Sequence, residues 1–482
     1  MGWLGCSGGM TPCASSTAEW AQRQFGDANL GDRRRTARLV QIGRRAAESP
    51  SGKLSQVFSG ARELDAAYDF VESDAVSAAE VDASIGRATA ELARQEPYVF
   101  VAVDGSSASL TDTQEAKGFG SVGSLEGRGR GLKVISALAM DSRGATLGLV
   151  TQTWWTRRGA TRRSRKEKRR QNRRQKPHEK ETRYWLQTIE CAAERLQKGG
   201  ARAWFQLDRE ADAWPMLLAL EQSGHHFTVR AAWDRLLAST GRNKQYLRGF
   251  LGKTRPIGVY TVDLSAGPQR SARTARLVAR AARVELALPV SKKRRVTLTV
   301  NAVWVTEKAP PAGEKPLDWL LLTNASITTA AESLSVVRGY TLRWRIEDFH
   351  KSWKSGGCNV EQMQLRSPNA VVRWATILAA VATRIERIKH LGRTQPDAPA
   401  TLELTPLELR VLIVLKREQK KRTETIPDGI PTIGQAMRWI ADLGGYTGVS
   451  SGGPPGSITL GRGYEKLIVA VQAVQAWEQA QN

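Results

Sequence analysis

The sequence predicts an α/β protein in which a sheet-containing middle region is flanked by helical regions. Two observations support this. From Tyr98 onward, short apolar runs alternate with helical segments, whereas at both ends of the chain the apolar residues recur at helical spacing. At 482 residues the chain can bury a large core, and we expect two or three domains.

Residues 17–95 are predicted to be helical. Asp32 is the expected N-cap of a helix that buries Leu39 and Ile42. The exposed side of this helix carries six arginines with Asp32 as the only acid beside them: Arg33, Arg34, Arg35, Arg38, Arg44 and Arg45. This density favours a surface that contacts phosphates over a merely solvated face.

The middle region begins with a short apolar run, 98–104, that ends in Asp104, as expected of a buried strand. A later apolar run, 201–207, is likewise followed by an acid, Asp208. The remaining expected elements are strands 133–140, 145–151, 226–231 and 319–323, antiparallel β structure over 256–306, and helices 179–197, 209–222, 330–354, 371–391, 403–418, 431–443 and 463–480.

The charge balance points to a polyanionic partner. Lys and Arg number 72 against 47 Asp and Glu, a net charge of +25, and nucleic acid is the usual partner of such a protein. Residues 157–176 contain twelve Lys or Arg and one acid, Glu167, and so carry +11 of this charge. Self-repulsion predicts that this run is disordered until it meets nucleic acid. Solubility alone, or attraction to anionic lipid, remains the alternative.

The sequence predicts a cytoplasmic protein rather than a membrane or secreted one. The most apolar stretch, 370–385, is interrupted by Arg373 and Arg384 and is too short to span a bilayer. The start of the chain lacks the pattern of a signal peptide. The four cysteines are scattered without zinc-binding spacing, which is typical of reduced thiols: Cys6, Cys13, Cys191 and Cys358.

Three acids are the candidates for chemistry. Asp104 and Asp208 each follow a predicted buried strand, and Glu347 lies in the predicted helix 330–354. Two carboxylates at strand ends and one from a helix can hold two divalent ions about 4 Å apart, which clamp the attacking and leaving oxygens of a phosphoryl transfer. An Asp after a strand can also simply cap a loop, so neither aspartate is specific alone.

The predicted helix 330–354 adds a more specific pattern. At 100° per residue, a polar row falls within an arc of about 80°, and it consists of Tyr340, Arg343, Glu347, Lys351 and Lys354. Salt bridges at i,i+4 spacing are the simpler explanation of such a row. They do not explain Trp344 near the polar face, where an aromatic ring can stack on an unpaired base.

These residues resemble the insertion-sequence-four family of DDE transposases, bacterial cut-and-paste enzymes. The spacing of Tyr340, Arg343, Glu347 and Lys354 matches the family's YREK signature, and the whole string 340–354 resembles the Tn-five type. Asp208-Arg-Glu-Ala-Asp212 is similar to the second-aspartate motif. Asp104, the segment 30–40 and Leu443-Gly-Gly-Tyr446 resemble the first aspartate, the end-binding helix and the start of the last segment, in the family's order.

The resemblance implies a ribonuclease H-like core in which Asp104, Asp208 and Glu347 bind two Mg²⁺ ions, for which Mn²⁺ can substitute. It implies a homodimer in a synaptic complex that binds double-stranded DNA, both the element ends and the target, in the bacterial nucleoid. The implied DNA contacts are Tyr340, Arg343, Lys351, Lys354, Trp319, Trp344 and Arg209, with Arg34, Arg35 and Arg38 at the element end, and Asp212 in support.

The expected domains are a helical DNA-binding domain at 1–77, a catalytic domain at 78–390 and a helical dimerisation domain at 391–482. A β-rich insertion is expected at about 240–318. Gly105 departs from the family, because a threonine follows the first aspartate in similar members, and the basic run 157–176 is longer than the matching loop. Two alternatives stay open: a catalytically inactive DNA-binding regulator derived from such an enzyme, and a nuclease of the same fold without joining activity.

Overall fold

The computed structural model describes residues 16–123, 129–157, 180–238, 244–264, 271–291, 294–419, 426–448 and 453–481. The chain divides into two compact units, and each is described by itself. One unit is the continuous segment 85–348, and the other combines 1–84 with 349–482. The chain passes from one unit to the other within α5 (Ala78–Ala93) and again within α11 (Arg345–Lys354).

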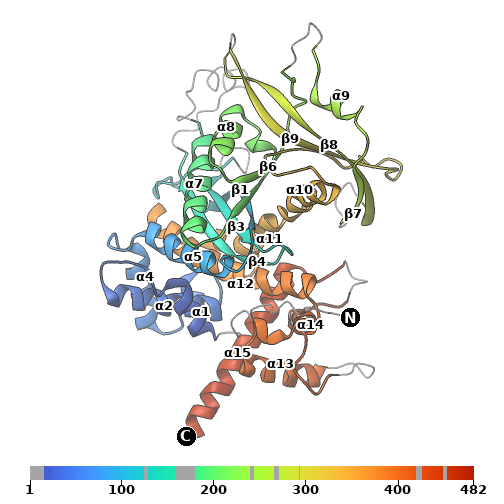
Figure 1. Cartoon of the computed structure of the whole chain (residues 1–482). Coiled ribbons are helices and arrows are strands. Elements are labelled where there is room, and N and C mark those ends of the chain that lie inside the picture. The colour runs from blue at the N-terminus through green and yellow to red at the C-terminus, as the bar shows by residue number, and fades with distance from the viewer. Residues whose placement is uncertain are drawn as a thin grey trace. The chain divides into compact units, whose positions relative to one another are not determined.

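The continuous unit is built on a mixed sheet that has ten strands among the described residues (Figure 1). Its first half consists of β1 (Val99–Leu110), β2 (Gly120–Ser121), β3 (Arg130–Met140), β4 (Thr146–Trp155), β5 (Ala203–Leu207) and β6 (His226–Arg230). β3 lies antiparallel between β1 and β4, and β5 and β6 run parallel to β1 on its other side. The strand order is therefore β4-β3-β1-β5-β6. Neighbouring strands are antiparallel from β4 to β1 and parallel from β1 to β6, which is the arrangement of a ribonuclease H-like core.

One face of this sheet is covered by α7 (Thr182–Lys198) and α8 (Trp214–Gln222). Alternate β1 residues, Val99, Val101 and Val103, belong to one buried cluster with Trp185 and Ile189 of α7. The expected helix 209–222 is divided, because a 3₁₀ turn, η3 (Arg209–Ala211), precedes α8. This apolar face fixes the register of the strands, since a slip by one residue would turn it toward the opposite side.

The opposite face of the sheet is covered by α10 (Ala330–Leu342), which contacts β1, β5, β6 and β10. Gly339 lies where the helix meets the sheet. A Cβ atom there would come within 2.6 Å of the Phe100 ring and 3.0 Å of the Gln206 Nε2 atom, so the close approach requires glycine. The even-numbered residues of β1 and β5 therefore point toward α10, because side chains alternate along a strand.

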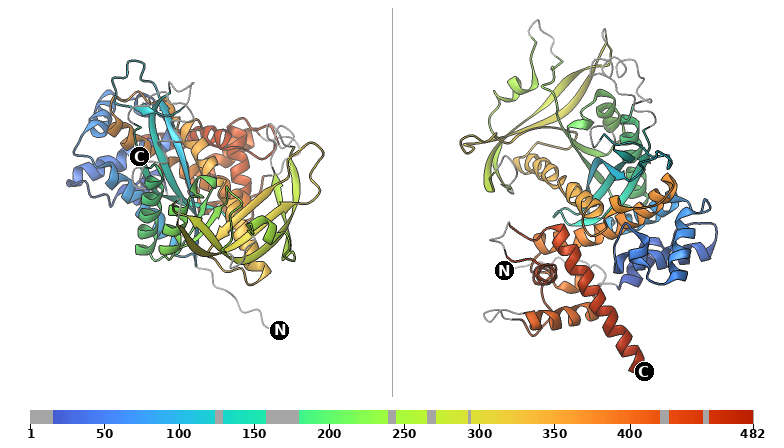
Figure 2. Two further views of the ribbon diagram at one scale, coloured as in Figure 1. Left: turned by 90° about the horizontal axis from the view of Figure 1, so that it is seen from above. Right: turned by 180° about the vertical axis from the view of Figure 1, so that it is seen from behind.

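The β-rich segment expected at about 240–318 extends the same sheet (Figure 2). It contains the short helix α9 (Leu247–Leu251), then β7 (Gly258–Leu264), β8 (Arg273–Pro289) and β9 (Arg295–Glu307), and β10 (Asp318–Thr323) joins it to the core. β10 pairs antiparallel with both β6 and β9, and β8 and β7 follow outward. The added strands thus cover the edge of the sheet that β6 would otherwise expose.

Two further sequence predictions about this unit were wrong in detail. The strand that carries Asp104 does not end there, because β1 continues to Leu110 in antiparallel pairing with β3. The expected single helix 330–354 is broken into α10 and α11. At the break Ile346 and Glu347 donate backbone hydrogen bonds to Arg343 and Trp344, three residues back, so the turn is tighter than an α-helix.

The second unit is helical. From the N-terminal part come α1 (Thr17–Phe25), α2 (Arg33–Glu48), α3 (Leu54–Val57) and α4 (Ala61–Glu72). From the C-terminal part come η4 (Val360–Gln362), α12 (Pro368–Thr394), η5 (Ala400–Leu402), α13 (Pro406–Gln419), α14 (Ile433–Leu443) and α15 (Ser457–Gln481). The expected helices at 371–391, 403–418, 431–443 and 463–480 are thus present, with α12 and α15 longer than predicted.

Helix α12 is the centre of this unit, and it contacts α2, α4, α14 and α15. Its apolar stretch is interrupted by two buried arginines with defined partners. Arg373 donates to the carbonyl oxygens of Val71 (2.8 Å) and Val76 (2.7 Å). The Arg384 guanidinium lies over the ring of Trp20, 5.7 Å from its centroid. None of the described helices has the length and apolarity needed to cross a membrane.

Candidate active site

The sheet places both aspartates of the expected triad on one face. Asp104 follows Val103 and Asp208 follows Leu207, and these two residues are paired partners in the parallel strands β1 and β5. Asp104 and Asp208 therefore extend from neighbouring strands at equivalent positions. Both share the even-numbered face with Phe100 and Gln206, which is the face that α10 covers.

The break between α10 and α11 brings Arg343 and Glu347 to this same place. One Arg343 guanidinium nitrogen lies 3.6 Å from a carboxylate oxygen of Asp104. Another donates to the Glu347 carboxylate at 2.7 Å. The Arg343 side chain is only 7% exposed, whereas that of Glu347 is 44% exposed. Arg343 therefore links the strand carboxylate to the helix carboxylate.

The charges of Asp208 and Glu347 act on the Asp104 carboxyl. Burial, together with the negative charges of Asp208 and Glu347, raises the pKa of Asp104 to about 7, against the opposing effects of the Arg343 guanidinium and the Gly105 N–H. Both acids are thus near enough to disfavour ionisation of Asp104. Partial burial of its carboxyl group and the charge of Asp208 also raise the pKa of Glu210, which lies in the turn η3.

Such a set of oxygens suits a hard divalent cation, which prefers carboxylate ligands and would relieve the mutual repulsion. The fit requires a local rearrangement. Among the described residues, Asp104, Asp208 and Glu347 do not form a group whose ligand atoms all lie within 4.8 Å of one another. Arg343 supplies the positive charge beside Asp104 and Glu347, so it would have to move as a cation enters.

Three segments of the sequence match models of transposase domains. Residues 126–384 match the transposase DDE domain. Residues 17–76 match the transposase DNA-binding domain, and residues 380–479 match the transposase Tn5 dimerisation domain. The DDE match covers more than half of the chain.

The chain is a Tn5-like DDE transposase.

This transposase thus combines a catalytic DDE domain with a DNA-binding and a dimerisation domain, and a DDE domain implies a divalent metal.

Other expected DNA contacts of the transposase differ in their exposure. Tyr340 is 1% exposed and Trp319 is 4% exposed, and their rings pack edge to face at a centroid distance of 5.6 Å. Trp344 is 44% exposed, and the Arg343 guanidinium lies 5.7 Å from the centre of its ring. Arg209 is exposed in η3, directly after Asp208. Of the two tryptophans, Trp344 is the one that presents its ring.

The two lysines expected to contact DNA, Lys351 and the YREK lysine Lys354, lie in the helical unit. Lys351 is exposed, and the Lys354 ammonium group lies 3.3 Å from a carboxylate oxygen of Glu361. The other side of α11 is buried, because Phe349 and Trp353 are both fully enclosed. The buried side of α11 therefore lies opposite Glu347 and Lys351, which belong to the polar row expected from the sequence.

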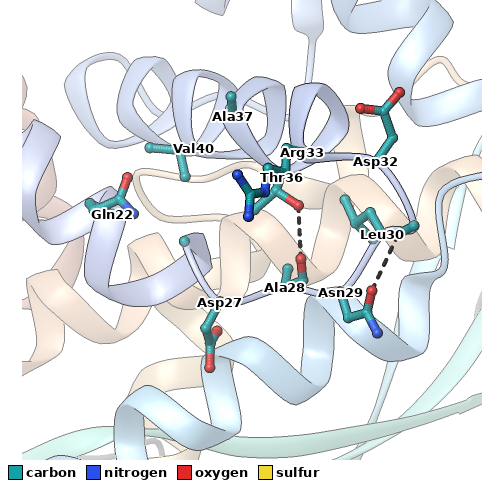
Figure 3. Close-up of a pocket in the computed structure, with 12 residues that line it drawn as sticks. Gln22, Asp27, Ala28, Asn29, Leu30, Asp32, Arg33, Thr36, Ala37 and Val40 are labelled. Carbon is teal, nitrogen blue, oxygen red and sulfur yellow. Dashed lines mark hydrogen bonds between the residues drawn. The ribbon is translucent and has the colours of Figure 1, made fainter.

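The N-terminal DNA-binding segment forms a cavity of about 560 Å³ beside α2 (Figure 3). Asp32 caps α2 as expected, since its carboxylate accepts from the backbone N–H of Arg34 at 2.8 Å. The Thr36 hydroxyl donates to the Ala28 carbonyl at 2.8 Å, which ties the preceding loop to the helix (Figure 3). Asp27 and Arg33 also line the cavity.

The six arginines of α2 fall into two groups, a division that the sequence analysis missed. Arg33, Arg34 and Arg38 are exposed, and Arg35 is half-buried with one nitrogen donating to the Leu30 carbonyl at 3.1 Å. Arg44 and Arg45 instead form ion pairs with Glu48, and Arg45 also pairs with Glu63 at 2.9 Å. The acids at i+3 and i+4 could have revealed these pairs. The first turns of α2 therefore hold the exposed positive charge.

A further group near Asp208 was also missed. Asp212 has a fully buried side chain that pairs with Arg235, and its carboxylate accepts from the backbone N–H groups of Ala232 (2.7 Å) and Trp233 (3.3 Å). The sequence motif contained Asp212, but its partners lie about 20 residues later and are joined to it only by the fold. The basic run 157–176, apart from Arg157, lies outside the described residues, as do Cys6 and Cys13.

Gly105 is open to a larger residue. A Cβ atom at this position would meet only the Trp185 ring, at 3.5 Å, which is an ordinary van der Waals contact. The backbone N–H of Gly105 donates to the Asp104 carboxylate at 2.9 Å. The space around Gly105 therefore does not explain why this chain has glycine there rather than threonine.

Proposed function

We propose that this transposase moves a DNA element by cutting and pasting, with Asp104, Asp208 and Glu347 as its catalytic and metal-binding residues. The single observation that supports this most is the setting of Asp104, whose pKa is raised by burial and by the charges of Asp208 and Glu347, and whose carboxylate is linked to that of Glu347 through Arg343. When bound there, two Mg²⁺ or Mn²⁺ ions would supply Lewis acidity to the attacking and leaving oxygens.

The proposed reaction is a series of phosphoryl transfers. Water attacks the phosphodiester at the element end, the P–O3′ bond breaks and a 3′-hydroxyl is released. This hydroxyl attacks the opposite strand to form a hairpin, and a second water opens the hairpin. The 3′-hydroxyl then attacks a phosphodiester of the target DNA, which joins the two molecules.

The residues around the acids would hold the DNA during these steps. Arg343 would leave the two carboxylates and contact a phosphate, for which its planar guanidinium is suited. Tyr340, Lys351, Lys354 and Arg209 would contact neighbouring phosphates. In support of this, Lys351 and Arg209 are exposed.

Two tryptophans would take part in base flipping. Trp344 has an exposed ring that can stack on an unpaired base near the element end. Trp319 would first have to leave its contact with Tyr340.

The flanking regions would recognise the element and assemble the complex. Arg34, Arg35 and Arg38, in the first turns of α2, would contact the element ends. The proposed division is DNA binding by 1–77, catalysis by 78–390 and dimerisation by 391–482, with two copies in one synaptic complex. Because its partner is chromosomal DNA, we place the protein with the bacterial nucleoid.

The test uses duplex DNA that carries the sequences flanking the gene, where inverted repeats should mark the element ends. Glu347→Ala should abolish Mg²⁺-dependent cleavage while leaving duplex binding within about twofold of the wild type, because end binding uses arginines of α2. Glu194→Ala serves as a matched control, since Glu194 is an exposed acid that pairs with a cation, Lys198, and neither residue belongs to the proposed site.

The same assay separates the alternatives. Cleavage by Glu347→Ala in Mg²⁺ would refute the catalytic assignment. Binding without cleavage by the wild type would identify an inactive regulator, and nicking without a joined product would identify a nuclease that lacks strand transfer.

A further inference from the structure

A second cavity lies close to Asp208, in the continuous unit. It has a volume of about 570 Å³, and its walls come from the starts of α7 and α8, the loop after β6, the end of β8 and the start of β9. Its chemistry is mixed, with two tryptophans, two prolines, one lysine and two arginines, and the residues that carry the argument are Trp233, Trp214, Arg235, Arg295 and Lys180.

Trp233 is the most unusual residue of this cavity. It is 68% exposed, although an indole ring of this size is normally packed against other groups. Trp214 also lines the cavity and is half-buried, with Pro215 beside it. An exposed indole in a cavity with a second aromatic ring is the arrangement that proteins use to stack an unpaired base.

The loop that carries Trp233 is held rigidly. The buried Asp212 carboxylate accepts from the backbone N–H groups of Ala232 and Trp233, and it also accepts from Arg235 Nε at 2.9 Å. Arg235 is therefore committed to Asp212, and its side chain is only 10% exposed. The indole is thus presented on a fixed backbone, which lowers the entropy cost of binding.

The remaining cations can serve a phosphate backbone. Arg295 is exposed and Lys180 is half-buried, and both line the same cavity. Asp234 also lines it, and its carboxylate accepts from the backbone N–H of Arg248 at 2.9 Å. A strand with its base on the indole would therefore find positive charge within the same cavity, as a single-stranded site requires.

The cavity is also near enough to Asp208 to act on the same DNA. Asp208 begins the turn η3 and Asp212 ends it, so their Cα atoms lie at most about 14 Å apart. Because Asp212 lines the cavity, one wall of the cavity lies within a few nucleotides' length of Asp208 along a strand.

We propose that this cavity binds an unpaired nucleobase of the DNA substrate, stacked on Trp233, a few nucleotides from the phosphate that reaches Asp208. The role of this cavity in the reaction rests on the proposed function. Binding of a base in the cavity, however, can be measured without catalysis.

The experiment therefore measures binding by the full chain in EDTA, with an oligothymidine of about 20 nucleotides and a duplex of equal length as probes. Trp233→Ala should weaken oligothymidine binding roughly 5- to 150-fold, the range for the loss of one base–aromatic contact. Duplex affinity should stay within about twofold. Trp233→Phe should retain most of the affinity, since it keeps an aromatic face. Tyr246→Ala is the matched control, because Tyr246 is an exposed aromatic residue (47%) of the same unit outside the cavity lining.

A second readout locates the base directly. Oligothymidine with a central 5-iodouracil should photo-crosslink to the peptide that contains Trp233 or Trp214, identified by mass spectrometry. Crosslinks confined to other peptides, an unchanged oligothymidine affinity in Trp233→Ala, or an equal loss for duplex and oligothymidine would each overturn the proposal. None of these outcomes depends on cleavage, so they leave the catalytic proposal to its own assay.

Discussion

Asp104→Asn should stabilise the metal-free transposase, and the gain should grow as the pH rises. Burial raises the pKa of Asp104 to about 7, whereas the pKa of an aspartate is ordinarily 3.8. The folded state therefore favours the protonated carboxyl, and stability is lost as the pH rises from about 4 toward 7. Asparagine has nearly the same shape and does not ionise, so it escapes this loss.

The size of the effect follows from the two pKa values. Each pH unit between them costs about 1.4 kcal/mol, and the cost levels off above pH 7. Between pH 5 and pH 8 the advantage of Asp104→Asn should grow by roughly 2–3 kcal/mol. The ion pair with Arg343 forms only when Asp104 is ionised, and its effect is already contained in the pKa of about 7. Contributions that do not depend on pH, such as differences in packing, cancel in this comparison between two pH values.

The assay is denaturant unfolding at 25 °C in EDTA, followed by tryptophan fluorescence at both pH values. Asp263→Asn is the matched control, because Asp263 is an exposed aspartate of the same unit. Added Mg²⁺ should stabilise the wild type at pH 8 and narrow the gap, since the ion binds the ionised carboxylate. An equal advantage of Asp104→Asn at pH 5 and pH 8 would refute the reasoning.

Two further predictions concern ion pairs. Arg343→Gln should tighten Mn²⁺ binding by about tenfold or more, because the variant lacks the guanidinium that pairs with Asp104 and Glu347. Calorimetry measures the affinity, and unchanged or weaker Mn²⁺ binding would show that Arg343 does not compete with the metal. Asp212→Ala should lower the free energy of unfolding by about 3–5 kcal/mol, because it leaves Arg235 buried without its carboxylate. Lys198→Ala, in the exposed pair with Glu194, should cost at most about 1 kcal/mol, and a similar cost for both variants would argue against a special role of the buried pair.

Some features of this transposase were evident in the sequence because they depend on short-range patterns. The apolar runs before Asp104 and Asp208 predicted the strands β1 and β5, and Asp32 predicted the start of α2. Family membership could also be inferred, since the YREK spacing and the Asp208-Arg-Glu-Ala-Asp212 motif are local strings. The excess of positive charge indicated a nucleic-acid partner without any knowledge of the fold.

Other features were decided only by tertiary structure. The break at Arg343 and Trp344 could not be read from the sequence, because this segment has the periodicity of one continuous helix, yet the break brings Arg343 into contact with Asp104. The continuation of β1 beyond Asp104 depends on pairing with β3, a strand that lies later in the chain.

The raised pKa of Asp104 and the setting of Trp233 have the same origin. Each depends on burial and on partners far away in sequence, namely Glu347 for Asp104 and Asp212 for the Trp233 loop. The sequence by itself determined which residues could perform the chemistry, because residue type and local spacing are written in it. Only the tertiary structure decided their charge state and exposure, because desolvation and Coulomb interactions depend on distances in space.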